Sequence, residues 1–115
     1  AIDIQMAKDV LKNIIKPKEE LISIDSIQKV VGNFFNLKVS DFKVKRKYKG
    51  YVIPRQIAMY LSRKLTNASL LEIGEKFGGK DHSTVLHSIK KVEERISKDP
   101  SFKEMVENLH SRIKS

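Results

Sequence analysis

Residues 69–87 read SLLEIGEKFGGKDHSTVLH and predict two helices joined by a tight turn. The first four of these residues have the spacing of a capping box, which starts a short helix through residue 77. The pair Gly78-Gly79 supplies the turn, and a longer helix is expected over about residues 81–96. A short helix, a glycine turn and a longer helix are the outline of a helix-turn-helix.

The rest of the chain also shows helical periodicity, with no convincing alternating strand or internal repeat. Residues 1–16 are predicted to form an amphipathic helix that ends at Pro17. Ser23 is the expected N-cap of the next helix. The predicted core positions are Ile24, Ile27, Val30, Val31, Phe34, Phe35, Ile57, Ala58, Leu61, Leu65, Val85, Ile89, Val92, Ile96, Val106, Leu109 and Ile113. At 115 residues the chain has room for one compact all-α domain.

Two further helix starts are predicted from local signals. Pro54 fits the first position of a helix, where its missing N–H costs nothing, and the basic residues Arg55 and Arg63 fall off the apolar face of that helix. The sequence SFKE from Ser101 to Glu104 has the spacing of a second capping box, which is expected to open the terminal helix.

The charge of the chain is concentrated in one stretch. The sequence holds 23 Lys and Arg against 14 Asp and Glu, a formal net charge of +9. Residues 42–71 contain no acidic residue. Their basic residues, which carry +8 of the excess, are Lys43, Lys45, Arg46, Lys47, Lys49, Arg55, Arg63 and Lys64. The run at 43–49 is expected to be a loop, entered through a short turn at Ser40-Asp41 and ended by Gly50. Such an excess predicts a polyanionic partner such as nucleic acid, although a solvated loop is the alternative.

Several classes of protein are excluded or disfavoured. The chain has no cysteine, which excludes disulfides, thiolate catalysis and cysteine-ligated zinc and suits a reducing cytosol. The longest apolar runs are a few residues, too short for a membrane-spanning helix. Residues 74–80, GEKFGGK, match the start of a phosphate-binding loop, but Asp81 replaces the required Ser or Thr. His82 and His87 are five residues apart and cannot share a metal as an i, i+4 pair would. We expect no catalytic residues, no metal and no enzymatic activity.

Three segments together identify a family. They are PRQIAMYL at 54–61, LEIG at 71–74 and FGGKDHSTVLH at 77–87. These segments strongly resemble the signature of the bacterial DnaA family of chromosomal replication initiators, and the resemblance extends over about residues 22–96. The resemblance implies an all-α helical bundle with a helix-turn-helix over residues 22–115, which binds double-stranded DNA at DnaA boxes. It implies that residues 1–21 are the connector helix and linker from an ATPase module outside this chain, where ATP would bind.

The resemblance also implies a division of labour among side chains. The residues expected to contact bases in the major groove are Asp81, His82, Ser83, Thr84, Leu70 and Leu71. The residues expected to contact phosphates are Arg55, Gln56, Arg63, Ser69, Lys80 and Lys91. Either Arg46 or Lys47 is expected in the minor groove. The implied setting is the cytoplasm, in association with the nucleoid.

Some positions depart from the family pattern or have a second interpretation. Lys47 stands at the usual minor-groove position, and lysine is less suited than arginine to a narrow A·T groove. Counting 100° per residue from Val85 turns His82 toward the apolar side, so a partly buried His82 is the alternative to base contact. Asp81 is equally readable as a helix N-cap. For the whole chain, the alternative function is a basic helical adaptor that binds a protein partner through the same surface.

Overall fold

Every element of the described residues, 22–44 and 49–115, is helical in this computed structural model. The elements are α3 (Ile24–Phe35), the 3₁₀ helix η1 (Val39–Lys43), α4 (Lys49–Leu65), α5 (Leu70–Lys76), α6 (His82–Lys98) and α7 (Pro100–Lys114). Neither described range contains a strand. The predicted all-α fold is therefore confirmed. The helix predicted over residues 1–16 and the linker after it lie outside the described residues.

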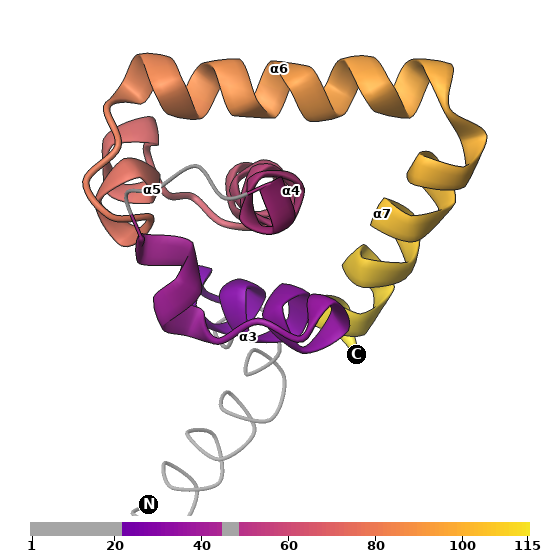
Figure 1. Ribbon diagram of the computed structural model, residues 1–115, viewed down its shortest axis with the longest axis horizontal. Helices are drawn as coiled ribbons and strands as arrows, with labels where there is room; N and C mark the ends of the chain where they lie inside the picture. The colour runs from indigo at the N-terminus through magenta and orange to yellow at the C-terminus, as the bar shows by residue number, and fades with distance from the viewer. Residues whose placement is uncertain (1–21, 45–48) are drawn as a thin grey trace, which may run out of the picture.

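Helix α4 occupies the centre of the bundle (Figure 1). In this view it is seen end-on, with α6 above it, α7 to the right, α3 below and α5 to the left. The side chains of Ile57, Ala58 and Leu61 are completely buried, as the apolar face of a central helix requires. The other helices thus form a frame around α4, and the helix-turn-helix of α5 and α6 makes up one corner of that frame.

The predicted core is largely confirmed. The buried members of the predicted set are Ile24, Ile27, Val31, Ile57, Ala58, Leu61, Val85, Ile89, Val92, Val106 and Leu109. The remaining members are half-buried, and all of them pack against this cluster: Val30, Phe34, Phe35, Leu65, Ile96 and Ile113. Phe42 of η1 and Phe77 are also fully buried, with their rings edge to face at 6.0 Å. This aromatic pair fixes η1 against the end of α5.

Local capping signals locate three helix starts. Ser23 and Ser26 form a reciprocal capping box at α3, with the Ser26 N–H donating to Ser23 Oγ at 3.1 Å. Ser69 caps α5 by accepting from the Glu72 N–H at 3.1 Å. Asp81 caps α6. These bonds satisfy N–H groups that have no acceptor inside their own helix.

The start of α4 differs from the prediction. The helix begins at Lys49, and Pro54 lies buried inside it rather than at its first position. A proline here removes the hydrogen bond that its N–H would have given to the carbonyl of Gly50, and its ring crowds that carbonyl, so the first turn of α4 forms at a cost that other contacts must offset. The half-buried side chain of Ile53 packs on the core, and this contact stabilises the additional turn. Gly50 therefore lies in the first turn of α4 instead of ending a loop.

The start of α7 also differs. Asp99, not Ser101, is the N-cap, and its carboxylate accepts from the N–H of Phe102 at 3.2 Å. Pro100 then occupies the first helical position, where its fixed φ angle suits the helix and no N–H is required. A carboxylate followed by a proline is the stronger start signal, so the capping-box spacing from Ser101 is coincidental.

Candidate nucleic-acid interface

The opening of α6 presents four polar side chains to solvent. Asp81, His82, Ser83 and Thr84 are all exposed, while Val85, the next residue, is completely buried. The exposed position of His82 removes the alternative that it is a partly buried residue at the helix start. The positive end of the helix dipole lies at this same opening, which favours nearby anions.

Asp81 carries out the capping role that the sequence allowed. Its Oδ1 accepts the Thr84 N–H at 2.8 Å. This hydrogen bond from the Thr84 backbone, together with one from the Thr84 side chain and the charge of His82, holds the pKa of Asp81 below its ordinary value. The group is an ionised carboxylate whose two oxygens offer about four acceptor sites, more than the two hydrogen bonds from Thr84 occupy. Capping is therefore compatible with accepting a hydrogen bond from a base.

The turn between α5 and α6 is formed by two glycines with positive φ angles. Gly78 has φ +89° and Gly79 has φ +79°, a region that other residues adopt at a cost. The carbonyl of Gly74 accepts from the N–H groups of Gly79 and Lys80, at 3.0 and 2.9 Å. These bonds connect the last turn of α5 to the start of α6, so the two helices keep a fixed relation across the turn.

The first turn of α5 offers one exposed apolar side chain. Leu71 is 62% exposed, whereas Leu70 is half-buried and packs against the core. Ser69 is exposed and already caps the helix. Of the two leucines predicted to face bases, Leu71 is the one that can meet a thymine methyl without a change in the bundle.

The predicted phosphate-contacting side chains differ in their surroundings. Lys91 and Arg63 are exposed, while Gln56 and Lys80 are half-buried. Arg63 Nη1 donates to the carbonyl of Ala68 at 2.9 Å, which ties the end of α4 to the segment that leads into α5. Because a guanidinium has five N–H donors, this bond leaves Arg63 able to contact a phosphate as well.

Arg55 is the clearest departure from the predicted surface. It falls off the apolar stripe by helical spacing, yet only 6% of it is exposed. Its Nη2 donates to the carbonyl of Val44 at 3.0 Å. Burial lowers the pKa of Arg55, although an arginine remains charged at any physiological pH. The arrangement holds the chain where η1 leads into the basic run, a role that periodicity in one helix does not reveal.

The two residues predicted for the minor groove, Arg46 and Lys47, lie outside the described residues. On their N-terminal side, the backbone of Lys43 lies against the turn between α5 and α6. A Cβ atom on Gly78 would overlap the carbonyl oxygen of Lys43 and lie 2.9 Å from its carbonyl carbon. The helix-turn-helix turn is therefore in direct backbone contact with the start of the basic run.

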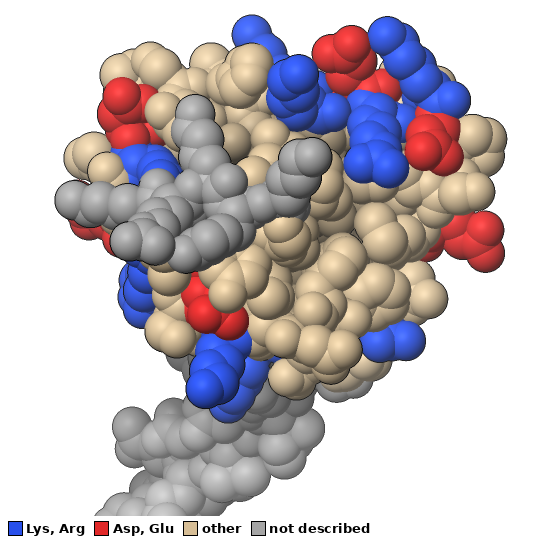
Figure 2. Space-filling view, in the orientation of Figure 1, with Lys and Arg blue, Asp and Glu red and all other residues tan. Residues whose placement is uncertain are grey.

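Charge is mixed on the face that Figure 2 shows. Basic side chains at the upper edge, over α6, are interleaved with acidic ones, and the described residues in the middle of this face are mostly uncharged. The sequence of α6 agrees, since Lys90 and Lys91 are followed by Glu93 and Glu94. Over the whole of α6 four basic residues stand against two acidic ones, so the helix adds two positive charges, all of them beyond its first turn.

Other kinds of site find little support. Among the described residues, no three His, Cys, Asp or Glu side chains come together as metal ligands would. The phosphate-binding-loop match at residues 74–80 begins inside α5, whereas that motif follows a strand. None of the helices in the described ranges is both long and apolar enough to cross a membrane.

Sequence reasoning missed Gln28, a polar side chain with no exposed surface. It lies four residues after Ile24 and three before Val31, within the buried stripe of α3. The signal that could have revealed it is an amide at a core position of an amphipathic helix, which predicts a buried hydrogen bond.

Comparisons with known proteins agree on one family. The family described as the bacterial dnaA protein helix-turn-helix matches residues 24–92. A solved structure described as the crystal structure of a DNA replication initiation factor superposes with a TM-score of 0.71 at 33% sequence identity. That match covers 96% of this chain and 35% of the other.

Curated relatives give the same result. Chromosomal replication initiator proteins DnaA from Geotalea daltonii and Citrifermentans bemidjiense are each 49% identical to this chain, over 114 and 112 residues. The protein of that name from Geotalea uraniireducens is 48% identical over 112 residues. These alignments cover 97–99% of this chain but only 24–26% of the relatives. The chain therefore spans about a quarter of the length of these relatives.

Proposed function

We propose that this chain, which belongs to the bacterial DnaA helix-turn-helix family, binds double-stranded DNA sequence-specifically at DnaA boxes, in the service of replication initiation. The observation that carries the proposal is the opening of α6, where the side chains of Asp81, His82, Ser83 and Thr84 are all exposed. They follow directly on the helix-turn-helix turn. A recognition helix enters the major groove by its N-terminal residues, which contact base edges there.

Each exposed side chain can make a contact with a base edge. The carboxylate of Asp81 can accept from the amino group of cytosine, and Thr84 can meet either a polar edge or a thymine methyl group. His82 and Ser83 can donate or accept. Leu71, exposed on α5, adds an apolar contact of the kind that thymine offers. We assign sequence readout to these residues and to Leu70 behind them.

Affinity and its salt dependence are assigned to the basic residues. Lys80 precedes the opening of α6 and Lys91 lies seven residues after Thr84 in the same helix. The other proposed phosphate contacts are Ser69, the N-cap of α5, and Gln56 and Arg63 of α4. We keep Arg46 or Lys47 as the minor-groove contact. For Arg55, whose side chain bonds to the Val44 carbonyl, support of the basic run is proposed in addition to any phosphate contact. Contacts of this kind position the protein and release counterions.

The proposed role is binding, with no chemical step and no cofactor assigned to this chain. ATP binding and assembly on the origin are proposed to belong to parts of the longer relatives that this chain does not cover, and the setting is the cytoplasm, at the nucleoid. A regulatory protein that docks on the same surface is compatible with this role.

The test is fluorescence anisotropy of the chain with a DnaA-box duplex and a scrambled duplex of the same composition, over a salt series. We expect the box to bind tighter by well over about tenfold, with a slope of about −0.9 in log affinity against log salt for each phosphate contacted. Equal affinity for the two duplexes at every salt concentration would refute sequence-specific binding. Equally tight binding to both duplexes, with a steep dependence of affinity on salt, would mean that the chain binds polyanions without sequence specificity.

A further inference from the structure

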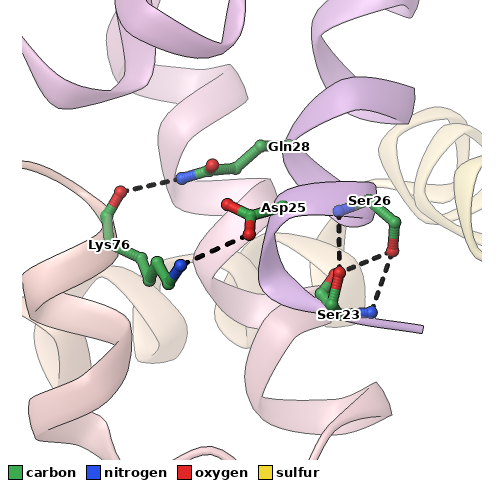
Figure 3. A network of polar contacts seen from close by, with 5 residues as sticks. All are labelled: Ser23, Asp25, Ser26, Gln28 and Lys76. Atoms are coloured by element: carbon green, nitrogen blue, oxygen red, sulfur yellow. Dashed lines mark hydrogen bonds and ion pairs between the residues drawn. The ribbon is translucent and has the colours of Figure 1, made fainter. Parts of the chain in front are cut away.

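A buried amide connects α3 to the helix-turn-helix. Gln28 has no exposed surface, and its Nε2 donates to the carbonyl oxygen of Lys76 at 2.9 Å (Figure 3). The two residues are 48 positions apart in the sequence. The bond therefore joins the first helix of the described bundle to the last residue of α5.

The carbonyl that Gln28 contacts lies at a sensitive point. The last four carbonyls of a helix have no N–H partner inside that helix. In α5 the carbonyls of Ile73 and Gly74 accept from N–H groups of the following turn, while that of Lys76 accepts from Gln28. Since α5 has only seven residues, a hydrogen bond at its last residue constrains the direction of the whole helix and of the turn that follows.

An ion pair lies beside this bond but is weaker. The Nζ atom of Lys76 is 3.3 Å from Asp25 Oδ2, and both side chains are about half exposed or more, at 48% and 61% (Figure 3). Exposed pairs of this kind contribute little because water and salt screen them. The amide is the stronger constraint, since the Gln28 side chain is buried and its hydrogen bond is partly shielded from solvent.

The amide carries a cost that packing alone does not explain. No hydrogen-bond donor among the described residues reaches Gln28 Oε1, which is also buried. A buried acceptor without a partner is destabilising, whereas an apolar side chain of similar volume avoids the penalty. Filling the space between α3 and α5 would therefore be achieved more favourably by a methionine. What the amide adds is direction, through one oriented bond to Lys76.

We propose that Gln28 is a positioning residue for DNA recognition: it fixes the end of α5 and, across the Gly78-Gly79 turn, the angle at which α6 presents Asp81 to Thr84. This inference rests on the proposed function. It assigns to Gln28 no contact with DNA. Its effect is on the discrimination between sequences, because base contacts depend on the angle of α6 more strongly than phosphate contacts do.

The test compares two variants with the unmodified chain. Gln28→Met removes the amide but keeps the volume, and Lys76→Ala removes the ion pair but keeps the carbonyl that Gln28 contacts. Affinity for box and scrambled duplexes is measured by anisotropy, with thermal unfolding by circular dichroism. We expect Gln28→Met to lower the box-to-scrambled affinity ratio about fivefold or more, as losing one base contact does, with little change in unfolding midpoint. Lys76→Ala should leave the ratio unchanged.

Amide hydrogen exchange supplies a second readout. In Gln28→Met we expect faster exchange over residues 74–80 with the other helices unchanged, because the constraint that is lost is local. An unchanged affinity ratio would overturn the inference. So would an unfolded Gln28→Met chain, since the amide would then be needed for stability rather than direction. If the unmodified chain itself showed no preference for the box, the proposed function would fail first, and this inference with it.

Discussion

The contact between the helix-turn-helix turn and the start of the basic run makes a sharp prediction about two neighbouring glycines. Gly78 and Gly79 both have positive φ angles, +89° and +79°, so an alanine at either position is strained by its backbone. Only at Gly78 does a new Cβ atom also meet Lys43, whose backbone it would overlap. Nothing lies within 4 Å of a Cβ built on Gly79. Gly79→Ala is therefore a matched control for Gly78→Ala.

The expected magnitudes follow from these two contributions. The left-handed backbone costs about 1–2 kcal/mol for an L-residue, and both variants share this cost. Forcing extra volume into a packed site costs about 1–3 kcal/mol more, and only Gly78→Ala incurs it, because the atoms it meets are backbone and cannot rotate away. The difference between the variants is thus about 1–3 kcal/mol, or at least about 4 °C in the unfolding midpoint of a domain of this size.

Thermal unfolding by circular dichroism, at one protein concentration and pH 7, measures that difference. We expect Gly79→Ala to lower the midpoint modestly and Gly78→Ala to lower it further. Equal midpoints for the two variants would refute the close approach of Gly78 to Lys43. The packing of the turn against η1 would then have to be abandoned as the feature that holds the start of the basic run.

Other predictions concern helix starts and pH. The Thr84 backbone N–H lowers the pKa of Asp81, so the ionised cap should stabilise the fold above the ordinary pKa of 3.8 and lose this effect as the pH falls through the lowered value. Asp81→Asn keeps a capping oxygen but cannot titrate, so unfolding midpoints measured between pH 7 and 3 should lose this pH dependence. Burial, and then two nearby lysines, lower the pKa of His110 from its ordinary 6.5. The unfolded chain therefore binds more protons below that pH, and the unfolding midpoint should decline as the pH falls from 6.5. The same decline in a His110→Gln chain would contradict this. In urea titrations, Asp99→Ala should lower the free energy of unfolding by about 1 kcal/mol, because it removes the cap of α7, whereas Ser101→Ala should lower it much less. The reverse order would favour the capping box that the sequence predicts at Ser101.

The helix-turn-helix was predictable because its signals are local. Ser69, Asp81 and the glycine pair each act within a few residues of their own position, so spacing alone located both helices to within about two residues. The apolar stripes were equally reliable, since burial on one helix face follows directly from a 3.6-residue period.

The errors arose where distant parts of the chain decide. Pro54 was placed at a helix start because packing of Ile53 on the core is not visible in the local pattern. Arg55 was placed on the surface because its partner, the Val44 carbonyl, lies on a different element. Gln28 was overlooked for the same reason, since its partner is 48 residues away. Tertiary contacts override local preference in each case.

The base contacts proposed for α6 are tested most directly by one comparison, the affinity of His82→Ala and of the unmodified chain for box and scrambled duplexes. Lys98→Ala, at the other end of α6, serves as the control. Because His82 is exposed at the opening of the helix, its substitution should cost about 1–3 kcal/mol of binding free energy on the box and little on scrambled DNA, while the control changes neither. An unchanged affinity of His82→Ala for the box would contradict the account.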